Sequence, residues 1–325
     1  ELAHDAEEAT EEVGRSGASS WYEVVPAKDG DLLIFESARG STLRRFALAS
    51  GTFGEVQELS VAVHAAVRSP ASPEKVCLLH CPSHWGSDHR YEVYSLDTSS
   101  PESFPNLEPL FVSSALKAEK EKLEKEKLVE AGIAPKQRHG FSLAPYDCSL
   151  YFLCGLQHFP GDVTGSFVYC FSLEQRVWTE VEYTGTFPAS RPGLPYKGCR
   201  FGQSCVVQGR KAWLFGGCVS TETGGVQPTS NLFSFDLEEH RFEEVLAGAS
   251  LERWPAALSG HSSVAFDGKV FVFGGDDGAQ DVYCYDIAKS SWTLLPPLLL
   301  GPRPCDGRVV HALTKSHVVA YQQGS

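Results

Sequence analysis

The 325-residue chain contains no methionine and no long apolar run, and each absence narrows the possible classes of protein. A transmembrane helix needs roughly 18 consecutive apolar residues, so we expect no membrane span. The acidic N-terminal stretch is not a secretory signal peptide, and a chain without a start residue suggests a processed product or a fragment. The net charge of −13 argues against nucleic-acid binding, because phosphates are neutralised by clustered basic side chains.

Motifs that mark common enzymes are also missing. The chain has no GxSxG, no P-loop and no GxGxxG after a predicted strand. Its ten cysteines form no CxxC pair, and a reduced thiol inside a strand packs as a small apolar side chain. The cysteines in predicted strands are Cys77, Cys154, Cys170, Cys205 and Cys284. We therefore expect an intracellular, cytoplasmic protein with reduced cysteines and no cofactor.

A repeated hairpin is the strongest signal in the chain. The clean copies, AFDGKVFVFGG (265–275) and VQGRKAWLFGG (207–217), are two apolar strands joined by a tight polar turn and followed by Gly-Gly. Alignment with weaker copies places one residue of each in a common column: Phe35, Leu79, Leu153, Phe215, Phe273 and Tyr321. Glycine lets the strand end turn sharply and lets neighbouring backbone approach. Irregularly spaced copies of this size predict a toroidal repeat protein.

A second strand pair follows most of these hairpins. An aromatic residue lies six positions after a fixed column in four segments, namely Phe242 after Asp236, Trp292 after Asp286, Trp178 after Ser172 and Phe53 after Ala47. Apolar and polar residues alternate in LFSFDL and VYCYDI, as half-buried strands require. The repeating unit is therefore four antiparallel strands, a to d, arranged around a ring.

This pattern resembles the kelch repeat. The resemblance rests on Gly216-Gly217 and Gly274-Gly275 after strand b, Phe235 and Tyr285 in strand c, and Trp178 and Trp292 in strand d. It is specific for residues 138–296 and loose for 20–112, where Glu36-Ser37 and His80-Cys81 replace the glycine pair. The resemblance implies an all-β fold, a β-propeller of about six four-stranded blades over residues 19–323, preceded by an acidic, flexible segment 1–18.

The closure of the ring has two alternatives. Six a–b hairpins are present but only five c–d pairs, so the last blade, at 308–323, is incomplete or the natural chain continues beyond Ser325. The segment SWYEVV (20–25) is either an outer strand of that last blade or strand a of the first. We favour the second alternative, because the AKDGD turn that follows matches the AFDGK turn of a clean copy.

One inserted helix is predicted between the second and third blades, at residues 113–136. The segment is rich in Ala, Leu, Glu and Lys, and it begins after Ser113 or Ser114 and ends at Gly132. Leu116, Leu123 and Leu128 form a thin apolar stripe. The helix is either a solvated surface element or a docking arm for a partner helix.

The long connections identify a candidate binding face. In an antiparallel blade the b–c and d–a connections emerge on the same side, and here they are the long ones, as at 81–90, 155–165 and 218–230. Function usually lies on loops held by a rigid scaffold, so we expect the partner on this face. The candidate partner-binding residues are Trp85, His84, His89, Arg138, His158, Arg200, Asp276, Asp277, Arg303, Leu116 and Leu123.

Each candidate group has more than one interpretation. HCPSHWGSDHR (80–90) is a zinc site, a polar loop anchored by Trp85 or a loop of no special role, and its spacing fits no common zinc motif. The run DDGAQD (276–281) is a calcium site or, as we favour, an ordinary acidic turn. Arginines near the starts of inner strands, Arg138, Arg200 and Arg303, either clamp an acidic peptide or pair with blade carboxylates. We predict no metal.

The function predicted from these features is a protein-interaction module, as a scaffold, an adaptor or a structural subunit of a larger assembly. The expected partner is a basic or helical protein. The alternative is a metal-dependent propeller enzyme with its site at the channel mouth, because some kelch-like propellers are copper radical oxidases or iron-dependent specifier proteins.

Overall fold

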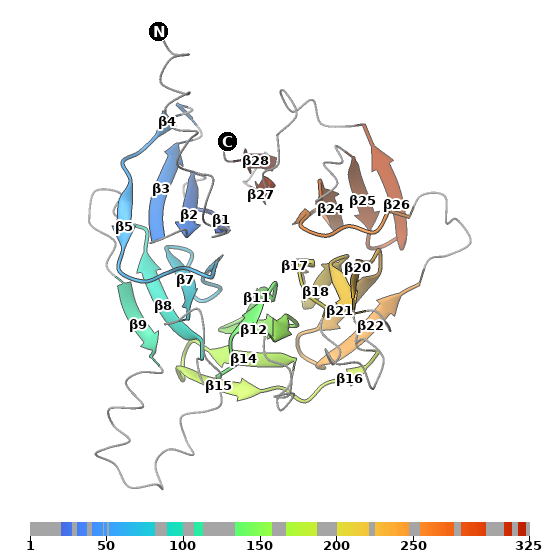
Figure 1. Ribbon diagram of the computed structural model, residues 1–325, viewed down its shortest axis with the longest axis horizontal. Helices are drawn as coiled ribbons and strands as arrows, with labels where there is room; N and C mark the ends of the chain where they lie inside the picture. Colours follow the sequence, from blue (N-terminus) through green and yellow to red (C-terminus); the bar gives the residue numbers. More distant parts are fainter. Residues whose placement is uncertain are drawn as a thin grey trace, which may run out of the picture.

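The strands that the computed structural model describes are arranged around a central axis (Figure 1). The described residues are 21–27, 31–37, 41–47, 49–50, 52–81, 90–99, 107–112, 134–157, 167–186, 200–220, 225–246, 254–275, 281–296, 309–313 and 318–322. Within these ranges there is no helix long and apolar enough to cross a membrane.

Five sheets of four or five strands form the blades. Blade 1 contains β1 (Trp21–Pro26), β2 (Leu32–Ser37), β3 (Ser41–Ala47), β4 (Thr52–Phe53) and β5 (Gln57–Leu59). Blade 2 contains β6 (Ala65–Arg68), β7 (Lys75–His80), β8 (Glu92–Asp97) and β9 (Leu107–Phe111). Blade 3 contains β11 (Ser142–Tyr146), β12 (Ser149–Leu153), β14 (Val168–Ser172) and β15 (Val177–Glu180).

The remaining blades follow the same order, with one addition. Blade 4 contains β17 (Ser204–Gln208), β18 (Lys211–Phe215), β21 (Leu232–Asp236) and β22 (Arg241–Val245), and β16 (Thr184–Gly185) pairs with β22 as a fifth strand. Blade 5 contains β23 (Ser262–Phe266), β24 (Lys269–Phe273), β25 (Val282–Asp286) and β26 (Ser291–Leu295). Three two-stranded sheets complete the described structure: β10 (Arg138–His139) with β13 (Leu156–Gln157), β19 (Cys218–Ser220) with β20 (Val226–Pro228), and β27 (Val309–Leu313) with β28 (Val318–Gln322).

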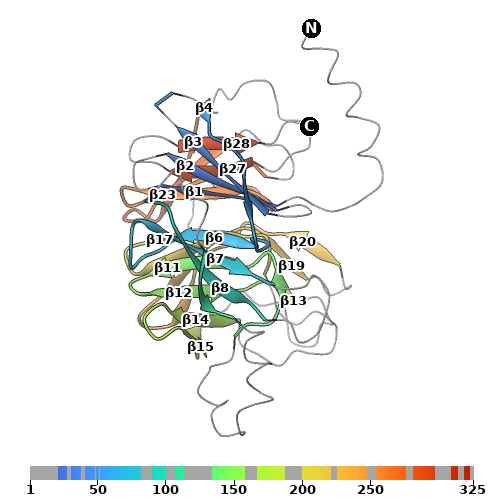
Figure 2. The same ribbon diagram turned by 90° about the vertical axis from the view of Figure 1, so that its left-hand side faces the viewer.

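The innermost strands close the ring. Strands β1, β6, β11, β17 and β23 lie side by side in this order, and β27 lies between β23 and β1 (Figures 1 and 2). The described residues therefore form an all-β propeller in which five blades have four or five strands. Strand β1 pairs with β2 around the AKDGD turn, so SWYEVV is strand a of the first blade, the favoured alternative.

Two details of the predicted fold differ from the structure. The structure describes five blades, and among the described strands β28 pairs only with β27, so six four-stranded blades are not present. The predicted helical insertion lies outside the described residues except for 134–136, which are not helical. Lys136 there forms a β-bridge with Arg90, and the predicted end of the helix at Gly132 lies outside the described residues, so the helical insertion stays a prediction.

The aligned apolar column explains why the blades pack together. Its described members, Phe35, Leu79, Leu153, Phe215 and Phe273, are all buried. Each of the first four packs with residues of the following blade: Leu79 of blade 2, for example, shares a core cluster with Phe152 of blade 3. The hydrophobic core therefore lies between adjacent blades, and the repeat is stabilised mainly by its neighbours.

The second column of the repeat forms the turns between strands c and d. The Asp236 carboxylate accepts hydrogen bonds from the backbone N–H groups of Glu238 and Glu239 at 3.1 and 3.0 Å. Asp286 accepts one from the N–H of Lys289 at 3.0 Å, and the Ser172 hydroxyl accepts one from the N–H of Gln175 at 3.1 Å. Each turn then passes through a residue with positive φ: Arg176, His240 and Ser290. A short polar side chain at this column therefore caps the turn.

Candidate interaction surface

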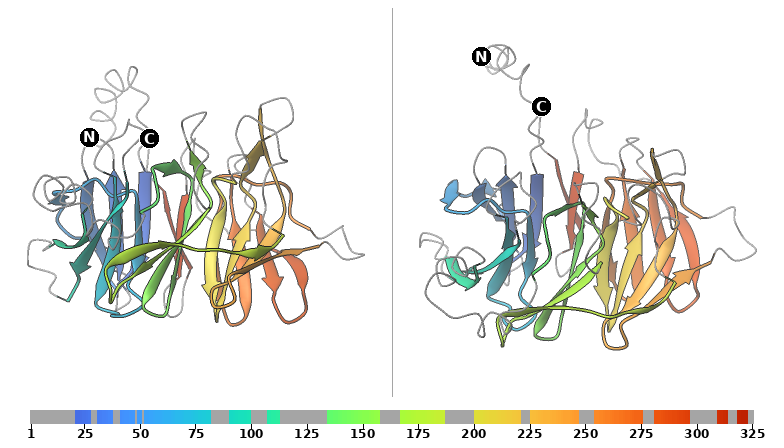
Figure 3. Two further views of the ribbon diagram at one scale, coloured as in Figure 1. Left: turned by 90° about the horizontal axis from the view of Figure 1, so that it is seen from below. Right: turned by 60° about the horizontal axis from the view of Figure 1, so that its bottom comes forward.

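The two faces of the propeller differ in their connections. Short a–b and c–d turns lie along one face, and we call the opposite side, where strands b and d end, the loop face (Figure 3). The sheets β10–β13 and β19–β20 lie on the loop face (Figure 2). The long connections that the structure describes therefore lie on the side predicted from strand direction.

Arg138 and Arg200 hold the strand ends of this face in place. Arg200 is 2% exposed, and its Nη1 donates to the carbonyl oxygens of Gly216 and Asn231. Its guanidinium lies 4.8 Å from the ring centroid of Phe233, and burial lowers the pKa of Arg200 to about 10. Arg138 is 4% exposed and Nη1 donates to the Cys154 carbonyl oxygen at 3.4 Å.

The roles predicted for both arginines, a clamp for an acidic peptide or an ion pair with blade carboxylates, stay predictions. In the structure each guanidinium bonds the carbonyl that follows strand b of its own blade and lies over an aromatic ring of the same blade, Tyr169 in the case of Arg138. Buried in this way, Arg138 and Arg200 order the strand ends of the loop face.

The glycine pair brings adjacent blades into backbone contact. Gly216 and Gly217 have φ values of 61° and 81°, in the left-handed region that favours glycine. A Cβ on Gly216 would lie 2.6 Å from the carbonyl oxygen of Leu258 in the next blade, and the Gly217 N–H donates to that oxygen at 2.8 Å. Blade 3 makes the equivalent bond, from the N–H of Gly155 to the carbonyl of Arg200 at 2.9 Å, with Cys154 in the first position at φ 63°.

Buried polar side chains cross the same seams. Gln203 Nε2 of blade 4 donates to Ser142 Oγ of blade 3 at 2.9 Å, and Ser204 Oγ lies 2.8 Å from His261 Nε2 of blade 5. All four side chains are buried. Burial lowers the pKa of His261 to about 4, so the imidazole is neutral at pH 7. Neutral hydrogen bonds therefore fasten the inner seams between blades 3, 4 and 5.

The segment around His80 is the described beginning of the predicted polar loop. The His80 Nδ1 bonds the Ala62 carbonyl oxygen at 2.8 Å, and the Cys81 side chain is buried. Tyr91, after the loop, donates its hydroxyl to the Arg138 carbonyl at 2.7 Å and so joins blade 2 to blade 3. Within the described part of the chain, no group of three or more His, Cys, Asp or Glu side chains has the arrangement to hold a metal ion.

The other nine candidate residues all lie outside the described residues. They are His84, Trp85, His89, Leu116, Leu123, His158, Asp276, Asp277 and Arg303. Their predicted roles therefore stay predictions.

An exposed apolar pair on the loop face of blade 4 was not predicted. Val226, on β20, is 55% exposed, and Leu246, directly after β22, is 76% exposed. Val226 lies in the connection between strands b and c, and Leu246 directly follows strand d, so both are on the loop face. Gln227 and Pro228 beside Val226 are also exposed. Neither apolar residue belongs to a periodic pattern, so the length of the connection 218–230 was the only sequence signal for this patch.

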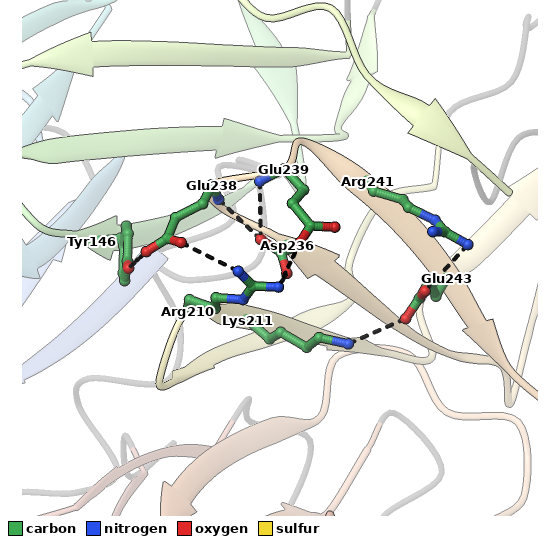
Figure 4. Close-up of polar contacts among 8 residues, drawn as sticks. All are labelled: Tyr146, Arg210, Lys211, Asp236, Glu238, Glu239, Arg241 and Glu243. Atoms are coloured by element: carbon green, nitrogen blue, oxygen red, sulfur yellow. Dashed lines mark hydrogen bonds and ion pairs between the residues drawn. The ribbon is translucent and has the colours of Figure 1, made fainter.

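Charged side chains on the turn face mainly pair with each other. Arg210 contacts Asp236 at 2.9 Å, Glu239 at 2.7 Å and Glu238 at 3.3 Å (Figure 4). Glu238 also accepts the Tyr146 hydroxyl of blade 3, so the cluster spans two blades. Burial would raise the pKa of Asp236, but backbone hydrogen bonds and Arg210 hold it below its usual value. The ion pairs of Arg210 lie within blade 4 and contribute little each where both partners are exposed, and the hydrogen bond between Tyr146 and Glu238 is the contact of this cluster that crosses to blade 3.

Comparison with known proteins places this geometry among repeat propellers. The model of the kelch motif matches residues 257–299, which span blade 5. The leucine-zipper-like transcriptional regulator 1 of Mus musculus is 26% identical over 177 residues, 51% of this chain and 19% of the relative. The Drosophila melanogaster homolog is 27% identical over 192 residues, 56% of this chain and 18% of the relative. Kelch domain-containing protein 3 of Bos taurus is 28% identical over 136 residues, 39% of this chain and 33% of the relative. The matches thus span a third or less of each of these relatives.

Proposed function

Since this chain is a kelch-repeat β-propeller, we propose that it is a protein-interaction module that holds its partner on the loop face. The observation that carries the proposal is the exposed pair Val226 and Leu246 on blade 4. Both residues lie on the face that carries the long connections, and function usually lies on loops held by a rigid scaffold.

We further propose that the module serves as an adaptor or a scaffold subunit. Kelch-type relatives support this class, although they match over only a fraction of their own length. The candidate residues outside the described ranges, among them Trp85 and His158, extend the proposed surface along the same loops. The net charge of −13 favours a basic partner.

The position of β27 and β28 in the ring suggests that the propeller has a sixth blade. Strand β27 occupies the gap between β23 and β1, and β27 with β28 repeats the a–b hairpin. We infer that this hairpin is the inner half of a sixth blade.

The proposal does not extend to metal-dependent catalysis, because His80 bonds the backbone of Ala62 and Cys81 is turned into the core.

The test compares the two faces of the propeller. The double variant Val226→Glu with Leu246→Glu places charge on the loop face, and Phe266→Glu is the matched control, because Phe266 is 53% exposed on the turn face. The immobilised full chain captures proteins from a lysate, and the amount of each is quantified by mass spectrometry. We expect the loop-face variant to lose the partners enriched on the wild type at least tenfold, and Phe266→Glu to retain them. Equal capture by the loop-face variant, or loss through Phe266→Glu, would contradict the proposal.

A further inference from the structure

The backbone N–H group just beyond strand b has a different kind of acceptor in blade 2 than in blades 3 and 4. Gly155 and Gly217, two residues after the aligned apolar column, donate their N–H groups to carbonyl oxygens of the next blade at 2.9 and 2.8 Å. The equivalent residue of blade 2 is Cys81, and its N–H donates to Nδ1 of His64 at 3.3 Å. A carbonyl oxygen accepts a hydrogen bond at any pH, whereas an imidazole nitrogen accepts one only while it is unprotonated.

The change of acceptor in blade 2 has a structural reason. The glycine N–H groups of blades 3 and 4 bond the carbonyl oxygens of Arg200 and Leu258, and the residue of blade 3 that aligns with these two is Arg138. The Arg138 carbonyl accepts the Tyr91 hydroxyl at 2.7 Å instead. The N–H at this position of blade 2 is therefore bonded by a side chain of its own blade.

The imidazole of His64 is held in place by backbone contacts on both sides. The His64 N–H donates to the Leu79 carbonyl at 2.8 Å, and the N–H of the preceding residue, Val63, donates to Ser41 Oγ of blade 1 at 2.8 Å. The His64 ring also meets the Tyr91 ring edge-on, with centroids 6.2 Å apart. Because His64 is only half-buried, a proton from solvent reaches this ring.

The same nitrogen of His64 lies near a second possible partner. Its Nδ1 is 3.3 Å from the carbonyl oxygen of Ala62, and the two contacts exclude each other. Nδ1 accepts the Cys81 N–H only through its lone pair and donates to Ala62 only when it carries a proton. When Nδ1 accepts, Nε2 carries the proton of the neutral ring, and the Ala62 oxygen is bonded by Nδ1 of His80 at 2.8 Å. One proton therefore selects between two arrangements.

Other titratable groups face this junction between blades 1 and 2. Glu23, two residues before the buried Val25, lies on the face of β1 that packs against blade 2, and burial raises its pKa to about 8, so it is neutral at pH 7. The rings of His64 and His80 lie 6.1 Å apart. The remaining charged or titratable groups are Cys81, Tyr91, Glu92 and Tyr94 of blade 2 and Arg138 of blade 3. Imidazoles ordinarily change charge between about pH 5 and pH 8, so the two histidines have to be separated by experiment.

We propose that His64 is a pH-dependent latch for the end of strand b in blade 2. Neutral His64 holds the Cys81 N–H through Nδ1. When a proton from solvent adds to Nδ1, its lone pair is lost, Cys81 loses this acceptor and the new N–H donates to the Ala62 carbonyl. Acidic pH thereby loosens the loop-face end of blade 2, whereas the ends of blades 3 and 4 keep their carbonyl acceptors. This latch is independent of a partner on the loop face.

The test follows single atoms of the full chain by NMR, with isotopically labelled cysteine and histidine. Imidazole spectra report the tautomer and the titration of His64, and the Cys81 amide is identified by its absence in Cys81→Ala. We expect the Nε2–H tautomer in neutral His64, and a Cys81 amide resonance that shifts with pH with the same midpoint as the His64 ring. The Nδ1–H tautomer at neutral pH, or two different midpoints, would overturn the proposal.

Two labelled amides of the same chain serve as matched controls for hydrogen exchange. Cys154 and Cys218 donate their N–H groups to the carbonyl oxygens of Phe167 and Phe201 at 2.9 and 2.8 Å. Between about pH 7.5 and about pH 5, we expect the protection of the Cys81 amide to fall about tenfold more than theirs, as the loss of one hydrogen bond implies. An equal fall at all three amides would refute a latch specific to blade 2.

A pair of variants assigns the effect to one imidazole. His64→Gln places in blade 2 the residue type of Gln203, which aligns with His64 in blade 4 and takes up no proton. We expect the pH-dependent shift of the Cys81 amide to disappear in His64→Gln and to remain in His80→Gln. A shift that persists in His64→Gln, or disappears in His80→Gln alone, would contradict the latch. Thermal unfolding checks that both variants fold. If His64→Gln does not fold, the midpoints measured on the wild type decide.

Discussion

Blades 1 and 2 and blades 3 to 5 are joined by different chemistry. In blades 3 and 4, backbone N–H groups of Gly155 and Gly217 bond carbonyl groups of the next blade. Between blades 1 and 2 the Ser41 hydroxyl accepts the N–H of Val63 at 2.8 Å, and between blades 2 and 3 the Tyr91 hydroxyl bonds Arg138. Blades 1 and 2 are therefore formed although neither contains the glycine pair. Side-chain hydrogen bonds contribute at both junctions, and between blades 2 and 3 the N–H of Tyr91 also donates to the carbonyl oxygen of Pro135 at 3.2 Å.

The largest expected difference between the two regions concerns the first residue of the pair. Gly216→Ala places a methyl group against the Leu258 carbonyl at a positive φ, so we expect a loss of about 3 kcal/mol of unfolding free energy. His80→Ala, at the equivalent position in blade 2, removes one hydrogen bond and is expected to cost about 1 kcal/mol. Urea denaturation measures both. Equal losses would show that the two kinds of seam do not differ.

The stability contributed by the contact between blades 4 and 5 should depend on pH. The pKa of His261 is lowered by burial from 6.5 to about 4, so the unfolded chain takes up a proton before the folded one as pH falls. The contribution of His261 to the free energy of unfolding is therefore complete above about pH 6.5. It decreases between that pH and about pH 4, by at most roughly 3 kcal/mol. Denaturation across this range measures the decrease. The variant His261→Gln introduces the residue that blade 4 has at the equivalent position, Gln203. In this variant the pH-dependent part of the unfolding free energy due to His261 should vanish. A pH profile equal to that of the wild type would contradict the assignment of the pH dependence to His261.

The side-chain seam between blades 2 and 3 gives a smaller effect. Tyr91→Phe leaves the buried carbonyl of Arg138 without this donor, and we expect a loss of about 1–2 kcal/mol. The measurement is again unfolding in urea. Ser41→Ala removes the corresponding acceptor between blades 1 and 2, with a similar expected loss. If neither substitution changes stability, side chains do not hold the first two blades in the ring.

The smallest effect is expected at the rim. Glu238→Gln weakens the contacts with Arg210 and Tyr146, and because Glu238 is exposed we expect about 0.5 kcal/mol or less. Glu182→Gln, an exposed position outside the cluster, is the matched control for the change in charge. The difference between the two should disappear at high salt. A loss of unfolding free energy above 1 kcal/mol would show that the charged cluster around Arg210 stabilises the protein more than exposed ion pairs usually do.

Packing that repeats was predictable from the sequence, and contacts made once were not. The column of Phe35 and Leu79 marked the buried strands, because each blade packs on its neighbour in the same way. Arg138 and Arg200 were placed correctly at the starts of inner strands. Their hydrogen bonds within the blades were not predicted, because these depend on carbonyl groups oriented by left-handed residues such as Cys154 and Gly216.

Two further features had no adequate signal in the sequence. The exposed pair Val226 and Leu246 depends on where two connections leave blade 4. Strand β16 has only two residues, Thr184 and Gly185, so no alternation could mark it. Its pairing with β22 depends on a parallel contact between blades, which a pattern within one repeat does not contain.

The strap formed by β16 also has a consequence for local opening of the ring. Because the chain leaving blade 3 is hydrogen-bonded to the outer strand of blade 4, neither outer strand separates without breaking contacts of the other. Blades 3 and 4 should therefore behave as one cooperative unit in native-state hydrogen exchange. The amides of Thr184 and Thr186 would exchange together with those of β22, whereas the amides of blade 5 would open independently.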